Sequence, residues 1–337
     1  AIFLIPAGRL ADIYGRKRLF TLGLIVHTIA AALAACSPSG TMLILCRALQ
    51  GTGGAMIFGT GIAILTSVYP AAERGKVLGY NVASVYLGLS LGPVLGGLLT
   101  QSLGWRSIFI VGLLLGVITI AFVVLRLHGE WAEARNDRFD VKGATLFSVS
   151  LGLAMFGFSM LPELPGLWVG LAGAGGLALF LWRQVRMPGP LLDTDLLLRN
   201  PAFLFSNIAA LINYSATYAV TFLLSLYLQY IRGLTPRAAG MVLICQPAVM
   251  ALCSPLAGRL SDRVEPRIVA SAGMGAIAVG LWFLASLESQ TSLLVVGAEL
   301  VVLGIGFGLF SSPNTNAVMS SVEKRSYGVA SSVLATM

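Results

Sequence analysis

The chain has 337 residues, of which 57% are hydrophobic and only 11% are charged, and its formal net charge is +8. A soluble domain averages about 25% charged residues, so this composition excludes an ordinary water-exposed surface and favours a protein that lies in a lipid bilayer. The basic residues form short clusters between apolar runs, so we expect no nucleic-acid partner. The cysteines lie in or beside apolar runs without metal-ligand spacing and are interpreted as apolar fillers, and no metal site is expected.

Apolar runs long enough to cross a bilayer recur along the whole chain, and no strand alternation competes with them. The chain starts inside an apolar run at residues 1–11 and stops inside another that begins near Gly328, so we expect at least one helix to be missing from each end. Ten complete spans are predicted, at residues 19–36, 41–68, 77–100, 105–127, 143–161, 166–184, 202–231, 238–258, 266–286 and 292–318.

The loops between these spans alternate in charge. Most of the 22 lysines and arginines fall in one alternate set of loops, whereas Arg106, Arg232 and Arg237 fall in the other set. Because positive loops are retained in the cytoplasm, the basic set is predicted to face the cytoplasm. We therefore expect a multi-pass protein of the cytoplasmic (inner) membrane.

The first basic loop has the sequence GRLADIYGRKR at residues 8–18. Gly8 permits close approach of helices and Gly15 permits a tight turn. Asp12 can pair with Arg16 or cap the start of a helix. An ordinary basic loop is the alternative interpretation.

The AGRLAD sequence at residues 7–12 returns as AGRLSD at residues 257–262, on the same predicted side of the membrane. A second, looser match pairs residues 51–54 and 73–75 with residues 304–308 and 323–325 in the same order. Matches on one side predict parallel repeats related by an axis along the membrane normal. We expect Asp262 in the second copy to be structural.

The segment LCRALQGTGGA at residues 45–55 places Arg47 in an apolar run. A buried arginine costs several kcal/mol unless it is paired or hydrated, which indicates a role for this side chain. The alternative is an arginine whose head reaches the nearby membrane interface.

The following span carries a glycine series: Gly79, Gly88, Gly92-Pro93 and Gly96-Gly97. Gly88, Gly92 and Gly96 share one helix face, which favours close helix packing. Pro93 removes a backbone donor and bends the helix. We interpret the series as a hinge or seal, with simple packing through small residues as the alternative.

These three segments resemble signature motifs of the major facilitator superfamily: its loop between the second and third helices, its fourth-helix motif and the antiporter motif of its fifth helix. Ile13 departs from the first motif, where a basic residue is usual. The resemblance implies an all-α membrane protein with two parallel six-helix bundles. It also implies a role for Arg47 in proton coupling, as the partner of an acidic residue, and a cytoplasmic gate formed by Gly8, Asp12, Gly15, Arg16 and Asp262.

Two extra spans, at residues 143–161 and 166–184, lie between the repeats. This arrangement resembles the fourteen-helix drug:proton antiporter family, of the EmrB/QacA type, over essentially the whole chain. The resemblance predicts three parts: an N-terminal bundle without its first helix at residues 1–127, a linker with the two extra helices at 128–200, and a truncated C-terminal bundle at 201–337.

Few polar residues lie inside the spans. Glu299 is the only acidic residue well inside one, where it can carry a proton or lie near the outer interface. In the resembled family the usual proton-linked acid lies on the first helix, which we expect to precede this chain. Candidate residues of a substrate cavity, for which interhelical hydrogen bonding is the alternative role, are Tyr86, Asn207, Tyr214, Tyr218, Gln229, Gln246 and Asn314.

The sequence thus favours a secondary transporter that exports drugs or other small amphipathic compounds by alternating access in exchange for protons. A metabolite or amino-acid exporter and a non-transporting membrane sensor remain open. No nucleophile triad, metal cluster or phosphate-binding loop occurs, so we expect no enzyme and no cofactor, with a proton gradient as the energy source. The expected partners are a small-molecule substrate and the bilayer, and a periplasmic adaptor protein stays an open question.

Overall fold

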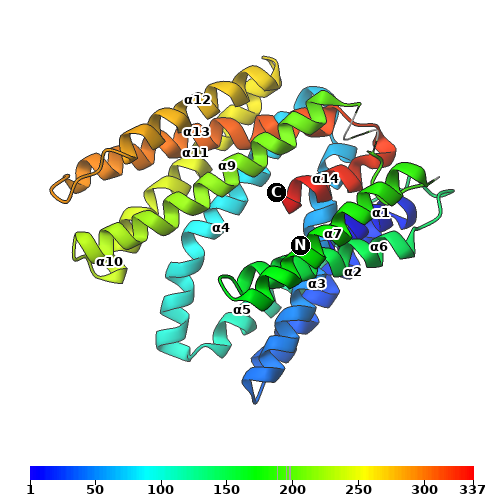
Figure 1. Ribbon diagram of the computed structural model, residues 1–337, viewed down its shortest axis with the longest axis horizontal. Helices are drawn as coiled ribbons and strands as arrows, with labels where there is room; N and C mark the ends of the chain where they lie inside the picture. The colour runs from blue at the N-terminus through cyan, green and yellow to red at the C-terminus, as the bar shows by residue number, and fades with distance from the viewer. Residues whose placement is uncertain (188, 195, 197–198) are drawn as a thin grey trace. The chain divides into compact units, whose positions relative to one another are not determined.

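The computed structural model describes residues 1–187, 189–194, 196 and 199–337, and in this part of the chain it contains helices and no strands. Positions 188, 195 and 197–198 of the predicted linker lie outside the described residues. Figure 1 shows the helices, which are α1 Leu4–Tyr14, α2 Arg16–Ala35, α3 Gly40–Val68, α4 Arg74–Leu103, α5 Arg106–Arg126, α6 Val141–Ser159, α7 Leu164–Arg186, α9 Pro201–Leu226, α10 Pro236–Leu243, α11 Cys245–Ser261, α12 Pro266–Leu284, α13 Leu293–Ser320 and α14 Tyr327–Thr336.

Ten segments of the described residues are long and apolar enough to cross a membrane, and they coincide with the ten predicted spans. The all-helical membrane fold is therefore confirmed. The predicted span at 238–258 consists of two helices, α10 and α11, which meet at Ile244. The span at 202–231 continues from α9 into a short π-helix, η2 Tyr227–Ile231, and short 3₁₀ turns, η1 Ala71–Glu73 and η3 Lys324–Ser326, precede α4 and α14.

Local sequence explains several helix ends. Gly15 separates α1 from α2 with a φ of 118°, a conformation that glycine adopts without steric cost. Asp140, Thr235 and Ser292 are N-cap residues whose side-chain oxygens accept backbone N–H groups of the first helical turn. These caps fix the starts of α6, α10 and α13.

The chain divides into two compact units, which are described separately. Unit 1 comprises Ala1–Ser67, Leu103–Leu204 and Val322–Thr336, and unit 2 comprises Val68–Ser102 and Phe205–Ser321. Each unit thus contains segments from both of the predicted bundles. The predicted division into residues 1–127, 128–200 and 201–337 stays a prediction.

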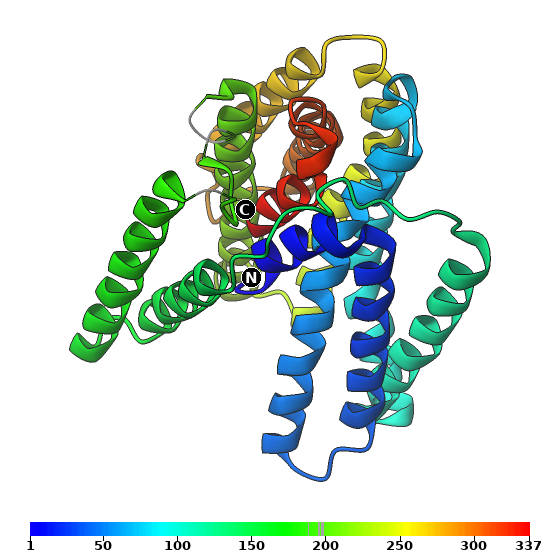
Figure 2. The same ribbon diagram turned by 90° about the vertical axis from the view of Figure 1, so that its right-hand side faces the viewer.

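In unit 1, α2 packs on α5, α1 packs on α14, and α6 packs on α7 (Figure 2). The α6–α7 pair is especially close, because a Cβ atom added at Gly157 or Gly173 would overlap the backbone of the other helix. Close approach through small residues is typical of helix pairs in membranes.

In unit 2, α13 is the central helix and packs against α11 and α12. Gly273 and Gly306 mark its closest crossing with α12. Towards its N-terminal end, Val296 and Leu300 form an apolar cluster with Leu224 and Leu228. Half of the residues in the apolar stretch of α13 are buried, against 6% of those in α5, so α5 leaves much more of its surface exposed than α13 does.

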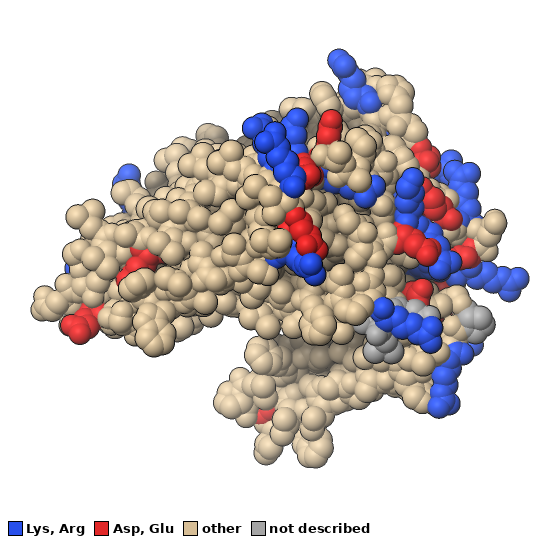
Figure 3. Space-filling model, turned by 90° about the horizontal axis from the view of Figure 1, so that it is seen from above, with Lys and Arg blue, Asp and Glu red and all other residues tan. Residues whose placement is uncertain are grey.

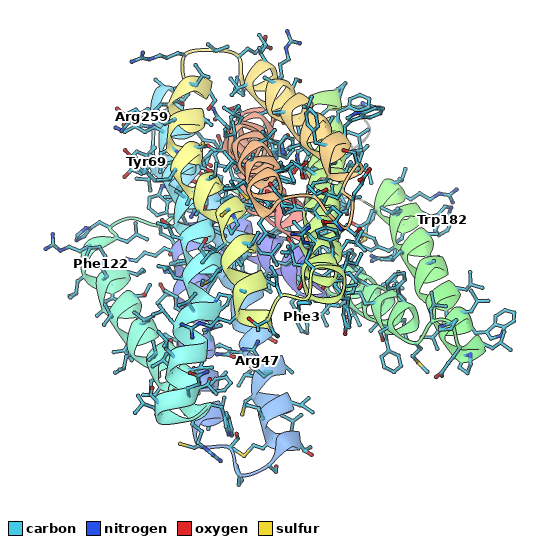
Figure 4. All side chains as sticks on the ribbon, turned by 90° about the vertical axis from the view of Figure 1, so that its left-hand side faces the viewer. Phe3, Arg47, Tyr69, Phe122, Trp182 and Arg259 are labelled. Atoms are coloured by element: carbon cyan, nitrogen blue, oxygen red, sulfur yellow. The ribbon has the colours of Figure 1, made fainter. Side chains whose placement is uncertain are left out.

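The outward side chains are mostly apolar, as expected for helices in lipid. Phe122 on α5 and Trp182 on α7 are both more than half exposed (Figure 4). Figure 3 shows charged side chains gathered in clusters on a surface that is otherwise uncharged. This pattern agrees with the clustered basic loops in the sequence.

Candidate functional site

Asp12 lies at the end of α1 in unit 1, and its side chain is fully buried. Its Oδ1 atom accepts hydrogen bonds from Arg16 Nε at 3.0 Å and Nη2 at 2.7 Å. The backbone N–H groups of Gly328 and Val329, in the first turn of α14, donate to the same carboxylate at 2.9 and 3.1 Å. Asp12 therefore both pairs with Arg16 and caps α14, the two roles that the sequence offered for it. We call this contact the Asp12 latch.

Arg16 joins several further segments of unit 1 to the Asp12 latch. Its guanidinium is fully buried and donates to Ser67 Oγ at 2.7 Å and to the backbone carbonyl of Lys324. It also lies 5.3 Å from the centre of the Tyr327 ring and 3.4 Å from Glu133 Oε2. A planar guanidinium with several donors suits such a multiply bonded position better than a lysine ammonium.

The two glycines of the first loop are explained by close contacts. A Cβ atom at Gly8 would overlap the carbonyl of Gly328 and the hydroxyl of Ser332 on α14. A Cβ atom at Gly15 would overlap the Glu130 carboxylate. The expectations of a close helix approach at Gly8 and a tight turn at Gly15 are therefore met in the geometry.

The second copy of the motif forms a matching contact in unit 2. Asp262 accepts hydrogen bonds from the backbone N–H groups of Gly75 at 2.7 Å and Lys76 at 2.8 Å, in the first turn of α4. Cβ atoms at Gly258 and Gly75 would each overlap the backbone of the other helix. Ser312 donates to the Gly75 carbonyl at 3.2 Å. We call this contact the Asp262 latch.

Both copies of the sequence repeat form the same kind of helix contact. In each copy a glycine permits two helices to touch, and an aspartate four residues later caps the touched helix directly after a 3₁₀ turn. The copies differ in burial and in charge pairing. Asp12 is fully buried with an arginine, whereas Asp262 is partly exposed and forms no salt bridge within the described residues.

The glycine series of α4 packs differently from the expectation. Gly79 lies against Ser254 and Pro255 of α11. At Gly88, Gly92 and Gly97, however, an added Cβ atom would meet no described atom within 4 Å, and Gly96 is half-buried. The expected close packing is therefore not found at Gly88 or Gly92 among the described residues.

The helical spacing of the buried residues explains why these glycines are exposed. The buried residues of α4 include Gly79, Ala83, Tyr86 and Ser90, which follow one another at helical spacing. At about 100° per residue, Gly88 lies about 200° from Tyr86, on the opposite side of α4. Pro93 lies inside the helix and is exposed, and the hinge role of the series stays a prediction.

Arg47 projects from α3 and is exposed (Figure 4). Its Nη1 atom donates to Gln50 Oε1 at 2.7 Å, and the Gln50 carbonyl is 3.2 Å from His27 Nδ1 on α2. No carboxylate forms a salt bridge with Arg47 among the described residues. Its predicted acidic partner is therefore not found in this part of the chain.

Polar candidates for a substrate cavity meet in unit 2. Tyr214 on α9 lies 3.2 Å from Ser311 on α13, hydroxyl to hydroxyl, and Tyr86 on α4 neighbours the same pair. Asn314 donates to the Ser206 carbonyl at 3.1 Å, which ties α13 to α9 near Asn207. The structure thus brings together residues from three helices that the sequence could only group by type.

Other candidates lie apart from this cluster. Tyr218 is 77% exposed, whereas Tyr214, one turn earlier on α9, is partly buried. Gln229 in η2 donates to Ser225, one turn earlier in α9 of the same span, at 2.9 Å. Gln246 is buried, and its Nε2 atom has no hydrogen-bond partner, so it keeps a free donor inside unit 2.

Glu299 is buried at 8% exposure, on the same part of α13 as the apolar cluster residues Val296 and Leu300. Its Oε2 atom has no hydrogen-bond partner. It is six residues into α13, which corresponds to about 9 Å from the start of the helix. That depth lies between the two positions that the sequence allowed, the span interior and the outer interface.

Several residues of the site had a weak signal in the sequence or none. Glu130, Glu133 and Asp137 in the connection between α5 and α6 contact the first loop, although they are more than 110 positions away from it. An excess of acidic residues in a loop on the basic side was the one available indication. Ser67 and Ser311 were missed because isolated serines are common in membrane spans.

The chain is similar to one known protein family and to several known transporters. The family model described as Major Facilitator Superfamily matches residues 1–337. The riboflavin transporter RibZ of Clostridioides difficile is 32% identical over 330 residues, which cover 98% of this chain and 72% of RibZ. The multidrug resistance protein Stp of Mycobacterium tuberculosis is 32% identical over 343 residues, which cover 99% of this chain and 63% of Stp.

A further relative is the methylenomycin A resistance protein of Streptomyces coelicolor, which is 29% identical over 99% of this chain and 71% of its own length. The crystal structure of the human organic anion transporter MFSD10 (TETRAN) is similar with a TM-score of 0.70 and 16% identity, over 99% of this chain and 70% of that one. At this identity the likeness shows the fold alone. This chain spans less than two thirds of the length of Stp.

Proposed function

Because this chain belongs to the Major Facilitator Superfamily, we propose that the whole protein is a proton-coupled antiporter of the fourteen-helix type, which exports drugs or other small amphipathic compounds across the cytoplasmic membrane. The family and the names of the relatives indicate a transporter and not an enzyme.

The observation that carries the proposal is the pair of matched latches. Asp12 caps α14 and Asp262 caps α4, and each contact joins a segment of the predicted N-terminal bundle to one of the predicted C-terminal bundle. Contacts of this kind are needed where two repeats alternately touch and separate. A static membrane sensor has no such requirement, which disfavours that alternative.

The proposed direction of transport (export) and the proposed driving force (a proton gradient) are supported by other observations. The glycine series with Pro93 is similar to the motif of exporters, and relatives such as Stp are named as resistance proteins. In the proposed mechanism Arg47 interacts with a proton-carrying acid, and Glu299 is a second protonatable group within a span. A carboxyl group placed in an apolar span can bind and release protons as its surroundings change.

A metabolite exporter is the second candidate, because RibZ is named as a riboflavin transporter and covers nearly all of this chain. Both candidates use the same cycle and differ in the substrate. A substrate panel that includes an amphipathic cationic dye and a flavin separates them.

Inverted membrane vesicles that contain the whole protein test the proposal. We expect an acid-inside gradient to drive uptake of the dye, and addition of the dye to release protons from the vesicles. Vesicles with Arg47→Gln serve as the comparison. If the flux of every compound in the panel is the same with and without the gradient, proton coupling is contradicted. If no compound shows any flux, a transport function is contradicted.

A further inference from the structure

The connection between α5 and α6, which we call the strap (Leu127–Asp140), lies across the first loop of unit 1. Figure 2 shows it running over the ends of α1 and α2 before it enters α6. Two backbone hydrogen bonds hold it there: Arg16 N–H donates to the Trp131 carbonyl at 2.9 Å, and Ala134 N–H donates to the Asp12 carbonyl at 3.1 Å. The strap is thus bonded to both members of the Asp12–Arg16 pair.

Glu130 of the strap supplies the cap that α2 lacks in its own sequence. The N-cap residue of α2 is Gly15, which has no side chain. The Glu130 carboxylate accepts hydrogen bonds from Lys17 N–H at 2.9 Å and Arg18 N–H at 3.2 Å, in the first turn of α2. A carboxylate at this position satisfies free amides and interacts favourably with the helix dipole.

The other two acidic residues of the strap also face the first loop. Glu133 Oε2 lies 3.4 Å from Arg16 Nη1, and Asp137 Oδ2 accepts a hydrogen bond from Arg9 Nη2 at 2.9 Å. All three carboxylates that precede Asp140 therefore hold residues of the loop that carries the Asp12 latch. Charge-assisted hydrogen bonds of this type are about twice as strong as neutral ones.

The far end of the strap is fixed to the extra helices. Asp140 caps α6 through Gly143 N–H at 2.9 Å and accepts two hydrogen bonds from Arg183 of α7, at 2.6 and 2.9 Å. Burial opposes ionisation of Asp140, but the bonds from Arg183, Gly143 and Gln184 outweigh it and hold the pKa of this carboxyl below its ordinary value. Hydrogen bonds therefore hold the strap at both ends, to the first loop at one end and to α6 and α7 at the other.

We propose that Glu130, Glu133 and Asp137 are positioning residues for the Asp12 latch, and that the α6–α7 pair acts through the strap to favour the closed latch. The inference rests on the proposed function in that the contact of α1 with α14 opens during transport. It assigns to the two extra helices a role in setting the gate equilibrium.

A cysteine at Ser332 reports the latch. Ser332 lies on α14, is fully buried, and packs against Gly8 and Gly59, so a thiol there is protected while the latch is closed. The four cysteines of this chain, and any others of the full-length protein, are first replaced by serine. Labelling by a membrane-impermeant maleimide in inverted vesicles, without substrate or gradient, then measures the open fraction.

Glu130→Gln should raise the labelling rate of S332C about tenfold, the effect of losing one charge-assisted interaction. The matched control is Glu163→Gln, because Glu163 precedes α7 but its side chain caps no helix. An unchanged rate in Glu130→Gln overturns the proposal.

A charge exchange separates positioning from general loss of structure. Arg9→Asp and Asp137→Arg should each accelerate labelling, and the double variant should return it towards the parent rate. Equal acceleration in the double variant overturns the proposal, because a simple packing defect is not repaired by exchanging charges. If the strap variants open the latch as expected but no compound is transported, the proposed function fails while this inference stands.

Discussion

Asp12→Asn removes a fully buried charge while nearly preserving the shape of the side chain. The Asp12 carboxylate is fully buried and accepts four hydrogen bonds, at 2.7 and 3.0 Å from Arg16 and at 2.9 and 3.1 Å from the first turn of α14. Removing one partner of a buried ion pair costs about 3–5 kcal/mol. Glu133 remains 3.4 Å from Arg16 and offsets part of this, so we expect about 3 kcal/mol.

A change of about 3 kcal/mol corresponds to about 150-fold in the equilibrium between the closed and the open latch. When labelling is slow relative to closing, the labelling rate of S332C is proportional to the open fraction. We therefore expect the rate to rise about 150-fold in Asp12→Asn, until labelling becomes limited by reagent access.

Asp262→Asn is the matched comparison, because it removes the same group from the equivalent latch. Asp262 is partly exposed and has two backbone donors, at 2.7 and 2.8 Å, but no arginine partner among the described residues. The amide oxygen of asparagine can still accept a hydrogen bond, so the expected loss is about 1.5 kcal/mol, or about tenfold. A cysteine at Ser312, which bonds to Gly75 in this latch, is the reporter. Equal effects of the two substitutions would refute the reasoning from burial and charge pairing.

Four other substitutions test separate parts of the structure. Gly8→Val should keep the latch open and sharply reduce transport, because Gly8 touches Gly328, whereas Gly275→Ala, at an exposed position of α12 where an added Cβ atom meets no described atom, should retain transport near the parent rate; the reverse order would refute the packing assignment. Arg47→Gln should abolish gradient-driven flux but leave substrate binding, measured by equilibrium dialysis, within about threefold, a change below 1 kcal/mol. Because the pKa of Asp140 is lowered in the folded protein, its ionised carboxylate stabilises the fold at pH values above the ordinary pKa of 3.8, and this stabilisation is lost as the pH falls through the folded pKa. The thermal unfolding midpoint should therefore decline between pH 5 and pH 2, and Asp140→Asn should remove this part of the decline. An identical decline in the variant would contradict the assignment.

The sequence predicts the parts of this molecule that depend on local physics. The ten spans follow from the length of apolar runs, and the role of Asp12 follows from the capping preference of aspartate and its spacing from Arg16. The second latch at Asp262 follows from the repeat, although its partner, the start of α4, could not be named from the sequence.

The packing expected for the glycine series of α4 could not be placed from the sequence. Helical periodicity shows that Gly88, Gly92 and Gly96 lie on one face, but it does not show which face another helix covers. In a membrane both the covered and the lipid-exposed faces are apolar, so composition does not decide between them. The role of the exposed Tyr218 in a substrate cavity stays a prediction.

The strap was missed for a different reason. Glu130, Glu133 and Asp137 are ordinary acidic residues of a loop, and their importance depends on partners far away in the chain. A single sequence contains no information on such pairs. Only the folded backbone, with Trp131 and Ala134 bonded to the first loop, brings these acids to the latch.

The length of α5 makes this protein sensitive to the thickness of its bilayer. Its 21 residues run from Arg106 to Arg126, with a charge at each end and an apolar surface between. At about 1.5 Å per residue the helix is about 32 Å long, close to the hydrocarbon thickness of about 30 Å. Short-chain lipids would force α5 to tilt or would strain the bond between Arg106 and the Ser37 carbonyl, so the lipid chosen for reconstitution is itself an experimental variable.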